Sequence, residues 1–175
     1  TCIGVPLGIA VDSDGGVLIA APGLPVRRVD AETGVITRFA GRPEACADHD
    51  RRDGGPARDA CLWSVSDVAV DGRGDVFIAD VWEATIRRVD AETGVIATFA
   101  ESGFDTLDQA LAIDDRGRLV VLGFSPSFVG QTVRRYDRDG QRSVILAGNG
   151  YFAYCGDLGP ARDACLGHVA DVAVG

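Results

Sequence analysis

The feature that most constrains the fold is an internal repeat. Residues 26–36 read VRRVDAETGVI and residues 86–96 read IRRVDAETGVI, so all but the first position is identical. Upstream lies a second repeated piece, LGIAVDSDGGVLIA at 7–20 and SDVAVDGRGDVFIA at 66–79, with a worn copy, QALAIDDRGRLVVL, at 109–122. Repetition at a fixed period indicates stacked copies of one small structural unit.

The Asp that ends the first predicted strand of each unit sets the period. Asp71 and Asp114 are 43 residues apart, whereas Asp12 and Asp71 are 59 apart. A unit of about 40 residues has the size of a four-stranded β-propeller blade, and the longer step carries an insertion. The second unit shows the expected strands best, because its short apolar runs alternate with Gly- and Asp-rich turns. These strands are 67–70, 76–79, 85–89 and 95–100.

We therefore predict an all-β fold, a partial β-propeller of three four-stranded blades plus the first strand of a fourth. The predicted blades cover residues 5–41, 65–101 and 108–147, and the next blade starts at 168–175. Blades bury their faces against neighbours, so the remaining blades of the same parent chain are expected partners.

Two insertions complete the predicted organisation. They cover residues 42–64 and 148–167. We expect both on one rim, each with a short helical turn at Pro56 or Pro160, because Pro is favoured at the first helical position.

Three segments together resemble bacterial NHL-repeat propellers. They are VAVDGRGDVFIAD at 68–80, IRRVDAETGVIATFA at 86–100 and DGGPARDACL at 53–62, the last with a damaged copy at 156–166. The resemblance covers nearly the whole chain and implies a six-bladed ring in the intact protein. It also implies roles ranging from docking platforms to extracellular sensors, lyases and lactonases. The loop at 81–84 departs from the family, whose loops there are commonly Asn-rich.

Four of the five cysteines recur in register with the insertions. Cys61 and Cys165 occupy one repeat position, and Cys46 and Cys155 precede them. We predict disulfides Cys46–Cys61 and Cys155–Cys165, each contributing about 2–4 kcal/mol; the alternative is that they are small buried hydrophobes. Cys2 then has its partner upstream. Disulfides would place this protein in an extracellular or cell-surface compartment of a bacterium.

The charge pattern argues against several partners. The net charge of −9 makes nucleic acid an unlikely partner. No apolar run is long enough to span a membrane.

The sequence offers few metal ligands. The histidines are His49 and His168 alone and no C-x-x-C spacing exists, so neither zinc nor another cofactor is expected. Residues 48–55 resemble a calcium loop but lack its final Glu, so we expect a solvated charged loop.

Paired arginines recur on each third strand, as Arg27-Arg28, Arg87-Arg88 and Arg134-Arg135. An RNA-binding stripe is one reading. Arg–Asp pairing between adjacent blades is the better one, because an Asp follows each pair two residues on.

Loop aromatics are the candidate contact residues, since aromatics in loops on a rigid scaffold often touch partners. They are Trp63, Trp82, Phe124 and Phe128; packing over the insertions would explain them equally well.

The sequence supports no Ser-His-Asp set, His-rich metal site or paired-carboxylate cleft. We therefore expect a non-catalytic binding platform for a protein or carbohydrate ligand in a secreted or surface-exposed protein. The alternatives are a propeller enzyme completed by further blades, and the extracellular sensor domain of a membrane receptor.

Overall fold

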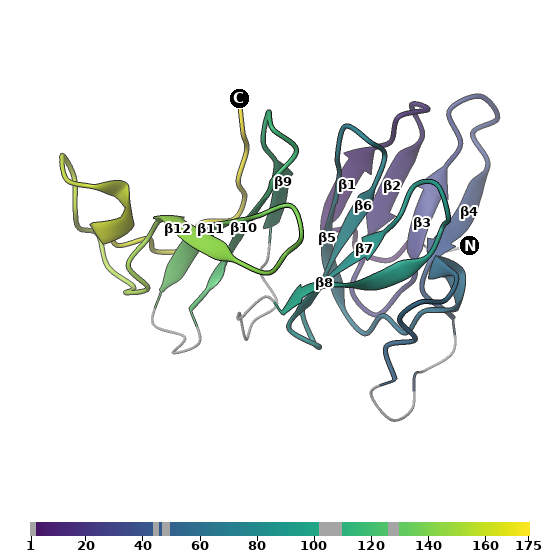
Figure 1. Ribbon diagram of the computed structural model, residues 1–175, viewed down its shortest axis with the longest axis horizontal. Helices are drawn as coiled ribbons and strands as arrows, with labels where there is room; N and C mark the ends of the chain where they lie inside the picture. Colours follow the sequence, from purple (N-terminus) through teal and green to yellow (C-terminus); the bar gives the residue numbers. More distant parts are fainter. Residues whose placement is uncertain (1–2, 44–45, 47–49, 102–109, 126–129) are drawn as a thin grey trace.

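The computed structural model describes residues 3–43, 46, 50–101, 110–125 and 130–175. Twelve strands in these ranges form three separate four-stranded antiparallel sheets, which we call blades 1, 2 and 3 (Figure 1). Blade 1 contains β1 (Gly8–Val11), β2 (Val17–Ala20), β3 (Val26–Val29) and β4 (Ile36–Ala40). Blade 2 contains β5 (Val65–Val70), β6 (Val76–Asp80), β7 (Thr85–Val89) and β8 (Ile96–Glu101). Blade 3 contains β9 (Ala110–Ile113), β10 (Leu119–Phe124), β11 (Gln131–Tyr136) and β12 (Ser143–Ala147).

Each blade is a simple meander whose first hairpin is closed by an Asp. The Asp71 carboxylate accepts the backbone N–H groups of Arg73 (2.9 Å) and Asp75 (3.0 Å), and Asp12 and Asp114 do the same in their own blades. Gly74 follows in the left-handed region with φ of 89°, which favours glycine. The repeated Asp therefore stabilises the turn between the first two strands of its blade, because its carboxylate accepts hydrogen bonds from the backbone of that turn.

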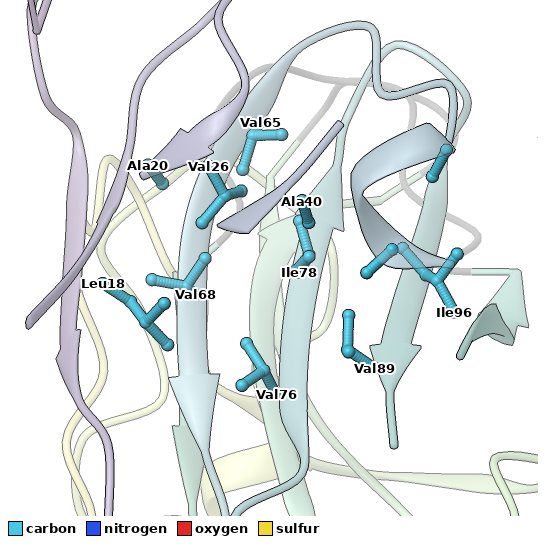
Figure 2. Packing of buried hydrophobic residues seen from close by; sticks show 12 residues of the cluster. Leu18, Ala20, Val26, Ala40, Val65, Val68, Val76, Ile78, Val89 and Ile96 are labelled. Atoms are coloured by element: carbon cyan, nitrogen blue, oxygen red, sulfur yellow. The ribbon is translucent and has the colours of Figure 1, made fainter. Parts of the chain in front are cut away.

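The core lies between the blades. Strands β5 and β6 are buried along most of their length, because both faces of blade 2 are covered. On one face Val68, Val76 and Ile78 pack against Leu18 and Val26 of blade 1 (Figure 2).

The opposite face of blade 2 packs against blade 3. There Phe77 meets Phe99 edge to face, with ring centroids 5.0 Å apart, and the ring centroid of Tyr136 in blade 3 lies 6.3 Å from that of Phe99.

On blade 1, the residues that match Val68 and Val70 in the repeat are Ile9 and Val11. Their side chains are 70% and 64% exposed.

The two insertions contain the short helical turns that the sequence predicts, as 3-10 turns η1 (Ala57–Asp59) and η2 (Ala161–Asp163). Pro56 and Pro160 stand one position earlier than expected, as the residues that precede each turn. Residues 168–175, which are expected to begin a fourth blade, pair with no strand in the described ranges, so the start of a further blade stays a prediction. The Gln131 side chain bonds to this segment at Val169, where it accepts the backbone N–H and donates to the carbonyl (2.9 Å).

Candidate functional site: the insertion rim

The candidate site is one end of the blades, which we call the insertion rim. In a four-stranded meander, the connection between strands two and three emerges at the same end as the chain that leaves strand four. Contacts fit this arrangement. The first insertion bonds to the β6–β7 connection through Arg51 and Glu83, and the second to Ser125, at the end of β10, through Gly150.

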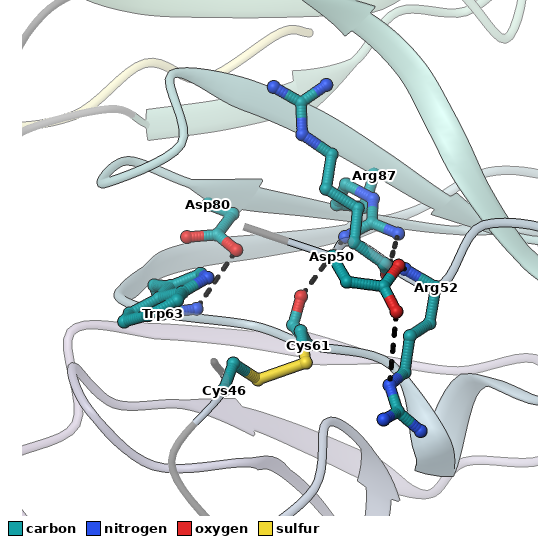
Figure 3. Close-up of a disulfide and its surroundings, with 8 residues drawn as sticks. Cys46, Asp50, Arg52, Cys61, Trp63, Asp80 and Arg87 are labelled. Carbon is teal, nitrogen blue, oxygen red and sulfur yellow. Dashed lines mark hydrogen bonds and ion pairs between the residues drawn. A yellow bond between two sulfur atoms is a disulfide. The ribbon is translucent and has the colours of Figure 1, made fainter. Parts of the chain in front are cut away.

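The first insertion is cross-linked at its base. Cys46 and Cys61 form a disulfide with Cα atoms 5.7 Å apart (Figure 3). Cys61 is buried, and the residues two and three positions after it are anchored to blade 2. The backbone N–H groups of Trp63 (3.0 Å) and Ser64 (3.1 Å) donate to the carboxylate of Asp80, the last residue of β6. Burial raises the pKa of Asp80, although these two bonds oppose that shift.

The middle of the first insertion runs along the outer edge of β8. Gly54 N–H donates to the Ile96 carbonyl (2.9 Å), and Ile96 N–H donates to the Gly55 carbonyl (3.0 Å). Pro56 then forms an antiparallel bridge with Val95. The insertion thus precedes blade 2 in the chain and lies along the outer edge of that blade through these backbone bonds.

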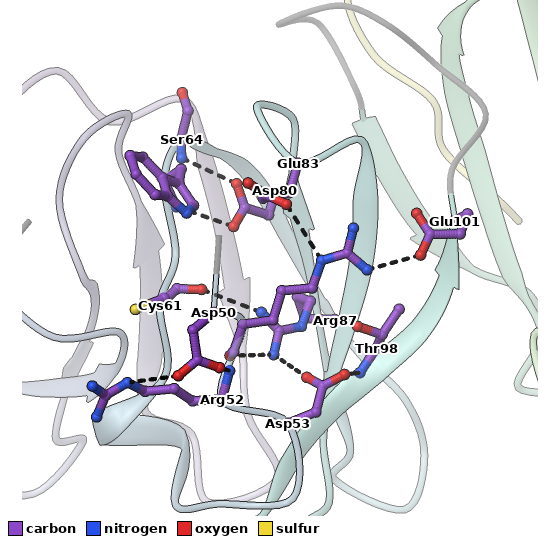
Figure 4. Close-up of polar contacts among 12 residues, drawn as sticks. Asp50, Arg52, Asp53, Cys61, Ser64, Asp80, Glu83, Arg87, Thr98 and Glu101 are labelled. Carbon is purple, nitrogen blue, oxygen red and sulfur yellow. Dashed lines mark hydrogen bonds and ion pairs between the residues drawn. The ribbon is translucent and has the colours of Figure 1, made fainter. Parts of the chain in front are cut away.

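Asp53 and Arg87 hold this segment in place (Figure 4). Arg87 is fully buried; it bonds the Asp53 carboxylate, the Cys61 carbonyl (3.2 Å) and the Arg51 carbonyl (3.0 Å). Asp53 also accepts the Thr98 N–H (3.0 Å). Burial acts to raise the pKa of Asp53, but the bonds from Thr98 and the charge of Arg87 outweigh it, so this pKa lies below its usual value.

Two expectations for these charges are corrected. The loop at 48–55 is not simply solvated: Asp53 is paired with Arg87, while Asp48 and His49 lie outside the described residues. In blades 1 and 2, the third-strand Arg–Asp pairs also lie within a blade and not between blades. Arg28 pairs with Asp12 and Asp30, all in blade 1.

Blade 2 shows the same arrangement, with Arg88 paired to Asp75 and Asp90. The reason is strand geometry. Successive side chains point to opposite faces, so Arg28 and Arg88 reach the turns of their own blades while Arg87 reaches the insertion.

The second insertion repeats the disulfide and the helical turn of the first insertion. Its cysteines 155 and 165 form a disulfide with Cα atoms 5.0 Å apart. Its turn is bonded to the end of blade 3, where Gly148 N–H donates to the Ala161 carbonyl (3.0 Å). Residues 156–160, which match the segment lying on β8, are exposed, and Leu158 is fully so.

The four aromatic candidates fall into different settings. Trp82 is 67% exposed in the β6–β7 connection, whereas Trp63 is half-buried beside Asp80. Phe124 meets His168 edge to face at 5.7 Å. Phe128 lies outside the described residues. A contact role for these residues stays a prediction.

Sequence reasoning missed three aromatics of the second insertion. Tyr151, Phe152 and Tyr154 are 63%, 61% and 88% exposed. The signal was present as YFAY at 151–154, immediately before Cys155. A short segment beside a disulfide that displays three large aromatic side chains is an uncommon surface for a chain without a partner.

A second feature is a hollow of about 510 Å³ where the inner strands begin. Asp67 and Asp171 line it, together with His168. Burial raises the pKa of Asp67 to about 6 and nearby Asp171 adds to the shift, although the Leu111 N–H (2.7 Å) and Val68 N–H (2.8 Å) bond this carboxylate. Among the described residues, no group of three or more His, Cys, Asp or Glu is placed to hold a metal ion.

The three blades, fanned about β1, β5 and β9, define the class of fold as a partial β-propeller. No family model matches the sequence, and no curated protein matches it significantly. Solved structures do match, at identities that show the fold alone.

A protein of unknown function from Bacteroides thetaiotaomicron matches with a TM-score of 0.68 and 12% identity, over 97% of this chain and 42% of that one. A chain of the nidogen/laminin complex gives 0.61 and 20% over 83% and 49%. Virginiamycin B lyase from Staphylococcus aureus gives 0.58 and 17% over 86% and 44%. The chain therefore spans less than half the length of these structures.

The disulfides indicate the compartment of the protein. Two disulfides in a chain of this size indicate an extracellular environment. No helix in the described ranges has the length and apolar character needed to cross a membrane.

Proposed function

We propose that this chain is part of a non-catalytic binding platform, in a secreted or surface-exposed bacterial protein of the NHL-repeat type, and that its insertion rim binds a protein partner. The observation that carries the proposal is the display of exposed aromatic side chains on the rim. Trp82 comes from a blade connection, and Tyr151, Phe152 and Tyr154 come from the second insertion. Aromatic side chains contribute much of the free energy of protein–protein binding, and the disulfides and backbone bonds limit the ordering that binding requires.

The test replaces Tyr151, Phe152 and Tyr154 with alanine together. The wild-type chain is immobilised and exposed to secreted proteins from cells that carry it; a retained partner is then titrated against the variant. We expect at least a tenfold loss of affinity. The matched control is Val35→Ala, an exposed apolar residue in the turn at the opposite end of blade 1. A partner retained equally by the triple variant, or lost from Val35→Ala, contradicts the proposal.

The hollow beside Asp67 favours a second candidate, a propeller enzyme completed by further blades. A carboxyl with a pKa of about 6, in a hollow that an imidazole also lines, is suited to acid–base chemistry. Turnover by the complete protein of a lactone or a cyclic depsipeptide, abolished by Asp67→Asn, would support this candidate over the platform.

A further inference from the structure

The two insertions share one segment almost residue for residue. Residues 53–62 read DGGPARDACL and residues 157–166 read DLGPARDACL, so Leu158 in place of Gly54 is the single difference. The backbone is alike as well, with φ of 81° at Gly54 and 66° at Leu158. The left-handed region is unfavourable for leucine. The second insertion therefore keeps the conformation of the first, although its sequence makes that conformation costly.

The first insertion uses this segment to bind the outer strand of the blade that follows it in the chain. Gly54 N–H and the Gly55 carbonyl bond to Ile96 of β8. Ala57 N–H donates to the Gly94 carbonyl (3.0 Å), shortly before that strand. An outer strand needs such partners, because its edge otherwise presents unpaired N–H and C=O groups.

The matching donors of the second insertion are free. Leu158 and Ala161 stand at the two donor positions, and no group in the described ranges accepts a hydrogen bond from their N–H groups. Both residues are exposed. The second insertion is thus folded to bind a strand edge that the described ranges do not supply.

The carboxylate of the first insertion has its counterpart too. Asp53 pairs with the buried Arg87 and accepts the Thr98 N–H (3.0 Å). Asp157 stands at the same position of the second insertion. Among the described residues, its partner is the hydroxyl of the exposed Tyr154 (2.6 Å), in the same insertion.

We propose that residues 157–161 bind the outer strand of a further blade, the one that residues 168–175 are expected to begin, and that Asp157 pairs with a buried arginine of that blade. The match with blade 2 selects this occupant, a four-stranded blade with arginine at the Arg87 position of its third strand. Since Asp53 and Arg87 are 34 residues apart, the new arginine stands 34 residues after Asp157. The contact does not depend on partner binding by the aromatic side chains, so the two can fail separately.

The first test uses the 175-residue chain. Gly54→Leu gives the first insertion the sequence of the second, and a Cβ at Gly54 meets no atom within 4 Å. We expect the bonds to β8 to survive, so that amide hydrogen exchange at position 54 stays at least about tenfold slower than at Leu158. Exchange as fast as at Leu158, or failure of the variant to fold, overturns the proposal, because the second sequence could then hold no strand edge.

The second test supplies a blade after the second insertion. Residues 167–175 are replaced by a second copy of residues 63–101, which places the copied Arg87 34 residues after Asp157. We expect the Leu158 amide to become protected from exchange in this extended chain. An extended chain in which that amide exchanges as fast as in the 175-residue chain, folded or not, overturns the proposal.

Matched variants separate the ion pair from general effects. Asp157→Asn should lower the denaturation midpoint of the extended chain and leave that of the 175-residue chain unchanged. Asp163→Asn, an exposed change in the same segment, is the control and should alter neither. Equal effects of Asp157→Asn on both chains overturn the proposal. So does concentration-dependent dimerisation of the 175-residue chain that Asp157→Asn abolishes, which would make the occupant blade 1 of a second copy.

Discussion

Asp53 of the first insertion forms an ion pair with Arg87 of β7, which is fully buried and lies 34 residues further along the chain. The pair joins a loop that precedes blade 2 to the centre of that blade. Because the same carboxylate accepts the Thr98 N–H, it also fixes the loop on the outer strand. The Asp53 side chain, which is 41% exposed, therefore anchors the Arg87 side chain, which is fully buried.

Replacing Asp53 with asparagine should destabilise the chain by about 1–3 kcal/mol, because the buried guanidinium of Arg87 loses its counter-charge. The measurement is chemical denaturation of both proteins. Asp59→Asn, an exposed change in the same insertion, serves as the control and should stay within about 0.5 kcal/mol of wild type. Equal effects of the two substitutions would show that the ion pair contributes nothing.

The two disulfides should differ in their rate of reduction, because thiol exchange depends on access to the sulfur atoms. Cys61 is 2% exposed, whereas Cys155 is exposed. Under limiting reductant, alkylation followed by mass spectrometry should therefore label Cys155 and Cys165 before Cys46 and Cys61. The reverse order would contradict the burial of Cys61.

Asp67 should give the chain a pH-dependent loss of stability. Its pKa is about 6 in the fold and near 3.9 in an unfolded chain. Between these values the folded chain binds more protons, so rising pH destabilises it, and the penalty is complete above about pH 6. Below about pH 4 the carboxyl is neutral in both states and the penalty is absent.

The variant Asp67→Asn keeps a neutral side chain at every pH. Its unfolding free energy relative to wild type should therefore rise by on the order of 2 kcal/mol between pH 4 and pH 7. Denaturation midpoints across that range provide the measurement. A difference that does not change with pH would mean that Asp67 titrates normally.

The two tryptophans should report separately on the rim. Trp82 is 67% exposed and Trp63 is half-buried. Trp82→Phe should remove most of the acrylamide-quenchable fluorescence and change stability by less than about 0.5 kcal/mol. Trp63→Phe should leave the quenchable emission and cost about 1–2 kcal/mol. Strong quenching that survives in Trp82→Phe would place Trp63 in solvent.

Much of the fold could be predicted from the sequence, for a local physical reason. Each strand is a short apolar run between turn residues, and the near-identity of 26–36 and 86–96 shows that the pattern is repeated. The cysteine pairs could be predicted too, because Cys61 and Cys165 stand in register beside the insertions; both pairs lie at disulfide distance.

The rim could be predicted only in part. Nothing local in the sequence shows that Asp53 reaches Arg87 or that residues 54–56 lie on β8, since these contacts form only after a whole blade has folded. The sequence predicts Arg–Asp pairing between blades, because the third-strand arginines and their aspartates recur together. Which of two adjacent arginines faces inward depends on the phase of β7, and one residue of shift reverses it.

The segment along β8 also has a consequence for biosynthesis. Asp53 leaves the ribosome 45 residues before Thr98, its partner on the outer strand. At roughly 5–20 residues per second, translation separates the two by several seconds. Cys46 and Cys61 are both complete in that interval, so oxidation can close the loop before its strand exists. A nascent chain of this protein can therefore contain the loop closed by Cys46–Cys61 before β8, the strand along which the loop lies, has been synthesised.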